Sequence, residues 1–65
     1  NTMTKIEMLQ KDIEALRKCI KLVMGTKSYL HIEKAKVLEV LHEQIERLEN
    51  RVRLQEIFIE QLKSQ

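Results

Sequence analysis

The chain is poor in the residues that bend, stiffen or cross-link a protein backbone. Its 65 residues include no proline, no tryptophan, one glycine, one cysteine, one tyrosine and one phenylalanine. A single cysteine, Cys19, excludes a disulfide within the chain, and the lack of a Cys/His cluster argues against structural zinc. A chain this short that lacks such cross-links usually gains its stability by associating with other chains. The composition therefore predicts an oligomer.

Long apolar runs and a strong charge imbalance are also missing. No uninterrupted apolar run exceeds three residues, whereas about 18–20 are needed to span a bilayer. We therefore expect no membrane partner. The net charge of +2 is too small to imply a polyanionic partner. A lone reduced thiol suits an intracellular compartment, the cytoplasm or the nucleus.

The chain does contain two long apolar ladders. Charged residues make up 34% of the sequence, a composition typical of long amphipathic helices. The first ladder follows alternating spacings of three and four residues through Ile6, Leu9, Ile13, Leu16, Ile20 and Val23. The second follows the same spacing through Leu38, Leu41, Ile45, Leu48, Val52, Gln55, Ile59 and Leu62. This alternation is the a/d pattern of a coiled coil, whose apolar seam is dry only against another helix.

One short segment interrupts the pattern, Gly25-Thr26-Lys27-Ser28. Gly25 falls where a left-handed residue often ends a helix, and Ser28 or Thr26 can cap the next one. We expect a single module over residues 1–65, with one helix over 3–24, a turn at 25–28 and a second helix over 29–63. The two ladders differ in heptad phase, which a hairpin tolerates. One long coiled coil with a stutter is the alternative.

The predicted fold is therefore all-α, a two-helix antiparallel hairpin that assembles into a helical bundle. Folded back, the shorter helix is expected to cover the longer one only to about residue 50. The seam from Val52 to Leu62 would then need a second chain. Leu54, Ile57 and Phe58 widen the apolar surface there. A dimer or a tetramer would supply this second chain. The charges at the e and g positions do not distinguish parallel from antiparallel pairing.

The residues expected at the oligomer interface are those of the two ladders, with one neighbour on the second helix. They are Ile6, Leu9, Ile13, Leu16, Ile20, Leu38, Leu41, Ile45, Leu48, Val52, Gln55, Phe58, Ile59 and Leu62. Gln55 is the only polar member, and a polar residue in a seam can fix the register or the oligomeric state.

The predicted function is homo-oligomerisation of a larger protein, so that the chain acts as a scaffold. Two alternatives remain open. The first is a nucleic-acid-binding hairpin that uses Lys11, Arg17, Lys18 and Lys21. The second is a docking surface for a foreign helical protein on Leu54, Ile57 and Phe58. The sequence has no catalytic triad and no glycine-rich phosphate loop, so we expect no enzyme, no cofactor and no metal site.

Overall fold

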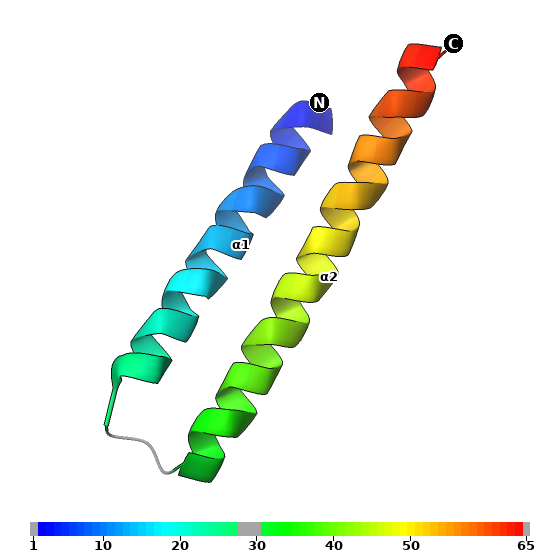
Figure 1. Ribbon diagram of the computed structural model, residues 1–65. Helices are drawn as coiled ribbons and strands as arrows, with labels where there is room; N and C mark the ends of the chain where they lie inside the picture. The colour runs from blue at the N-terminus through cyan, green and yellow to red at the C-terminus, as the bar shows by residue number, and fades with distance from the viewer. Residues whose placement is uncertain (1, 28–30, 65) are drawn as a thin grey trace.

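The computed structural model describes residues 2–27 and 31–64 and consists of two antiparallel α-helices (Figure 1). Helix α1 spans Thr2–Gly25 and helix α2 spans His31–Ser64. The described residues contain no strand. The expected all-α hairpin is confirmed, and the alternative of one continuous helix is wrong.

The end of α1 is built differently from the expectation. Gly25 is the last helical residue, and no described residue has a positive φ, so the left-handed cap predicted for Gly25 is absent. The backbone N–H of Thr26 donates to the carbonyl of Val23 at 3.3 Å, which tightens the last turn. Helix α2 begins five residues after Thr26, too far for Thr26 to be its N-cap. The other predicted cap, Ser28, lies outside the described residues.

A cation reaches the C-terminus of α1 from the second helix. The Lys34 Nζ donates to the carbonyl oxygen of Met24 at 3.5 Å. The last turn of α1 has no basic residue of its own. Because the C-terminal carbonyls of a helix carry partial negative charge, an ammonium group there is favourable. Lys34 therefore supplies the positive charge that the last turn of α1 lacks.

The core is a single seam between the two helices. Its buried side chains are Ile6, Leu9, Ile13, Ile45 and Val52, each 6–8% exposed. Leu16, Ile20, Leu48 and Ile59 are partly buried and pack against them. None of the described side chains is fully buried. In a layer of two helices, each helix is shielded from water only along the stripe that faces the other helix.

The register of the hairpin corrects one expectation. Val52 is buried and Ile59 packs on the core, although the sequence suggested that helix 1 would not reach them. The Arg17–Glu49 pair and the hydrogen bond from Lys34 to the Met24 carbonyl fix this register, in which the end of α1 lies beside the first turns of α2. Helix α2 extends past α1 at both of its ends (Figure 1), and Leu62, near its C-terminal end, is 54% exposed.

The molecule is elongated and exposes more surface than its mass requires. Its principal extents are 53 × 16 × 11 Å. The accessible surface is 5567 Å², whereas a compact monomer of 7.8 kDa has about 4,400 Å². Neither of the described helices contains a stretch long and apolar enough to cross a membrane.

Candidate oligomerisation surface

Most of the predicted interface residues serve the contact between α1 and α2. Nine of them form or adjoin the core, and Leu38 and Leu41 are half-buried. Gln55 is also half-buried. Phe58 and Leu62 are 51% and 54% exposed. The a/d seam is therefore largely used within one chain, and a surface for another chain must be sought beside it.

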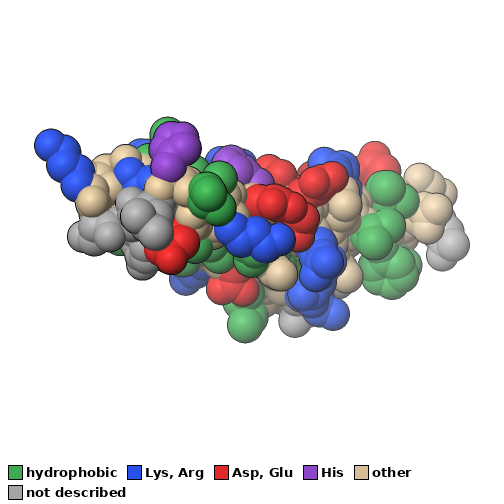
Figure 2. Space-filling view, turned by 90° about the horizontal axis from the view of Figure 1, so that it is seen from below, with side chains coloured by type: hydrophobic (Ala, Val, Ile, Leu, Met, Phe, Trp, Pro, Cys, Tyr) green, Lys and Arg blue, Asp and Glu red, His purple; other side chains and the backbone are tan. Residues whose placement is uncertain are grey.

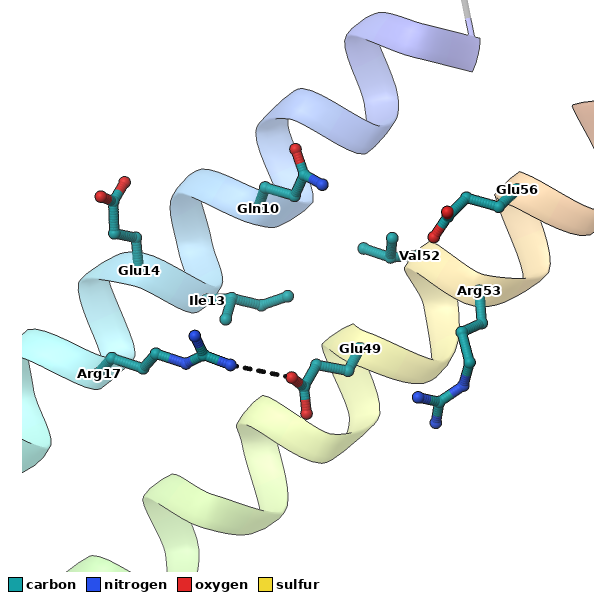
Figure 3. A pocket seen from close by; sticks show the side chains of 8 residues that line it. All are labelled: Gln10, Ile13, Glu14, Arg17, Glu49, Val52, Arg53 and Glu56. Carbon is teal, nitrogen blue, oxygen red and sulfur yellow. Dashed lines mark hydrogen bonds and ion pairs between the residues drawn. The ribbon is translucent and has the colours of Figure 1, made fainter.

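The two sides of the seam differ in chemistry. On one side lies an open groove, here called the ion-pair groove, whose walls carry Gln10, Glu14, Arg17, Glu49, Arg53 and Glu56. Ile13 and Val52 point toward each other at its floor (Figure 3). The Arg17 Nη2 and Glu49 Oε2 atoms are 3.0 Å apart across it. The walls of this groove are therefore polar or charged throughout.

The Arg17–Glu49 pair links the two helices but adds little stability. The two side chains are 61% and 41% exposed. Water and salt screen such a pair, which contributes at most about 1 kcal/mol. Its contribution is to the alignment of the helices, because it joins an e position of α1 to an e position of α2. Arg53 donates to the Asn50 side-chain oxygen within α2 and points away from α1 (Figure 3).

The other side has a second open groove, here called the Met8–Phe58 groove. Met8, Leu9 and Phe58 supply its apolar lining. Its charged residues are Lys5, Asp12 and Arg51, and Thr4 and Gln55 are polar. Met8 is 63% exposed and Phe58 is 51% exposed. This groove therefore combines large exposed apolar side chains with opposite charges.

Further apolar side chains cluster at the end of the hairpin where the two termini lie. Leu54, Ile57, Phe58 and Leu62 are 51–64% exposed. In Figure 2, hydrophobic side chains gather toward the end opposite the histidines, while acidic and basic side chains occupy the middle. The opposite end exposes Leu22, Met24 and Ile32. Exposed apolar patches of this kind mark surfaces that contact other proteins.

Met8 is the residue that the ladder pattern missed. It lies outside the a/d positions of the first ladder, so heptad reasoning did not select it. A signal was present nonetheless. Met8, Asp12, Ala15, Cys19 and Leu22 are spaced by four, three, four and three residues, which is a second seam beside the first.

The residues predicted for nucleic-acid binding and the possible metal ligands do not form one site. Lys11, Lys18 and Lys21 are exposed on α1, whereas Arg17 is engaged by Glu49. Nucleic-acid binding by these four residues stays a prediction. Cys19 is exposed. No group of three or more His, Cys, Asp or Glu residues within the described part of the chain is arranged to hold a metal ion.

Comparisons of the chain with protein-family models, curated proteins and solved structures find no match. The function of this chain is therefore inferred from the exposed surface of the hairpin.

Proposed function

We propose that this chain is a homo-oligomerisation module that holds copies of a larger protein together as a dimer or tetramer of hairpins. The observation that carries the proposal is the surplus of exposed surface. The chain exposes roughly 1,200 Å² more than a compact monomer of its mass. A stable interface buries about 800 Å² on each partner. The surplus is larger than this area, so the exposed surface is sufficient for one partner.

The composition of that surface supports the same function. In the described part of the chain, nine large apolar side chains are exposed, from Met8 on α1 to Leu62 on α2. Among the residues that the structure describes, five side chains form the buried core. A single layer of two helices has no further way to cover its apolar side chains, whereas a second layer would bury them and add to the core.

The test is size-exclusion chromatography with light scattering, together with circular dichroism, over a hundredfold range of protein concentration. The proposal expects a strongly helical dimer or tetramer that persists on dilution to the micromolar range. A chain that is monomeric throughout the range would overturn it, whether helical or not. A poorly helical monomer that gains helix on addition of a foreign protein would favour the adaptor function instead.

A further inference from the structure

A second layer of helices could pack on either of the two sides of the core, each of which carries a groove. The residues that line the two grooves favour one side over the other. In the ion-pair groove, a partner would have to desolvate Glu14, Arg17 and Glu49, together with other polar walls. Removing charged groups from water costs several kcal/mol for each ion that stays unpaired. The Met8–Phe58 groove is lined by three charged residues, Lys5, Asp12 and Arg51, against five in the ion-pair groove, and it exposes the large apolar side chains of Met8 and Phe58. A partner on this side therefore has fewer charged groups to desolvate.

The apolar character of this side extends along α1. Met8, Asp12, Ala15, Cys19 and Leu22 follow the alternating spacing of a coiled-coil seam. All five residues are exposed. Only Asp12 is charged, and Ala15 lies at the middle of the set. The small side chain of Ala15 lets another helix approach closely between the bulkier Met8 and Leu22.

The same side of α2 contributes apolar residues near both ends of the helix. Val40 and Phe58 are 18 residues apart, which is five helical turns, so they lie on one line along α2. Val40 is 44% exposed and Phe58 is 51% exposed. Gln44, Arg47 and Arg51 lie near the same line between them, so on this side of α2 two apolar positions flank a polar stretch.

We propose that a second copy of this chain packs on the side of the Met8–Phe58 groove, so that two hairpins form the two layers of a four-helix bundle. This inference rests on the proposed function and names the surface that performs it. The ion-pair groove then stays in water at the edge of the bundle. The seam between α1 and α2 and the seam through Met8, Ala15 and Leu22 would meet at the bundle core.

Two observations select a second copy as the occupant. First, the surplus of roughly 1,200 Å² is sufficient for one partner of standard size. Second, the surface complements itself. In a twofold interface the same patch meets itself, so each contact occurs twice. A patch that holds both Asp12 and Arg51 can pair the acid of one copy with the guanidinium of the other.

The first test compares two substitutions that each add one negative charge to α1. Ala15→Glu places the charge on the proposed interface, and Gln10→Glu places it in the wall of the ion-pair groove. We expect Ala15→Glu to raise the dissociation constant at least about tenfold, because a carboxylate there must be desolvated without a partner. Gln10→Glu should change it by less than about threefold. Sedimentation equilibrium measures both constants.

The second test uses neighbouring residues on α2 and does not introduce a charge. Phe58 and Ile57 are 51% and 54% exposed, but they point about 100° apart around the helix. Phe58→Ala should weaken association several-fold more than Ile57→Ala. Circular dichroism at high concentration checks that each variant keeps its helices.

The outcomes separate this inference from the proposed function. An oligomer that Gln10→Glu weakens as much as Ala15→Glu, or that Ile57→Ala weakens as much as Phe58→Ala, would overturn the assigned surface and leave the oligomerisation function standing. A wild-type chain that is monomeric at every concentration would overturn both. Selective weakening by Ala15→Glu and Phe58→Ala would support both.

Discussion

At the scale of single residues, Gly25 illustrates a position where glycine is present but its conformational freedom is not used. It ends α1 without a positive φ, and a Cβ built on it meets nothing within 4 Å. Glycine weakens a helix because its unfolded backbone has more freedom to lose. The native conformation is therefore compatible with alanine at this position.

We predict that Gly25→Ala stabilises the hairpin, by up to about 1 kcal/mol. Urea unfolding followed by circular dichroism at fixed protein concentration measures the free energy of unfolding. The matched control is Ala35→Gly at an exposed position of α2, which should lower that free energy by a similar amount. Destabilisation by Gly25→Ala would mean that the end of α1 needs a backbone conformation special to glycine.

At the scale of the helices, stability depends on a short stretch of close packing. Ile13 is 8% exposed, whereas Ile32 is 83% exposed although both are isoleucines on the two helices of one hairpin. The burial of an aliphatic side chain contributes free energy roughly in proportion to the area removed from water. The two positions therefore give a comparison in which the deleted atoms are the same.

We predict that Ile13→Ala lowers the free energy of unfolding by about 2–4 kcal/mol, which combines lost transfer energy with the cavity left behind. Ile32→Ala should lower it by less than about 0.5 kcal/mol. Thermal and urea unfolding of both variants provide the measurement. Similar losses at the two positions would show that Ile32 is covered in solution and that the exposed end of α2 belongs to an interface.

At the scale of the whole molecule, folding and association are coupled if the second layer exists. Binding of a second copy stabilises only the folded chain, so the midpoint of unfolding must rise with protein concentration. The elongated shape and the surplus surface indicate that an isolated hairpin gains little stability alone.

We predict that the midpoint of thermal unfolding, Tm, rises by on the order of 10 °C over a hundredfold increase in protein concentration. Scanning calorimetry or circular dichroism at several concentrations measures this shift. Ala15→Glu should reduce the slope, because its assembly is weaker. A Tm that does not depend on concentration would indicate a hairpin that folds as a monomer.

The sequence by itself determined the two helices and the stripe that each one buries. Both depend on local spacing: an alternation of three and four residues places side chains on one face whatever else the chain does. Ile6, Ile13, Ile45 and Val52 were identifiable in this way and lie in the core. The hairpin was also predictable, because a glycine and a polar segment separate two ladders of different phase.

Only the tertiary structure decided the register of the helices and the difference between the two sides of the seam. A heptad pattern repeats every seven residues, so sliding one helix by seven residues again places apolar positions opposite each other. The ladders therefore fit several registers, and the expectation that Val52 would be uncovered chose the wrong one. Long-range contacts such as the Arg17–Glu49 pair are specific to one register. In that register the polar walls flank one edge of the core, and Met8 and Phe58 share the groove on the other.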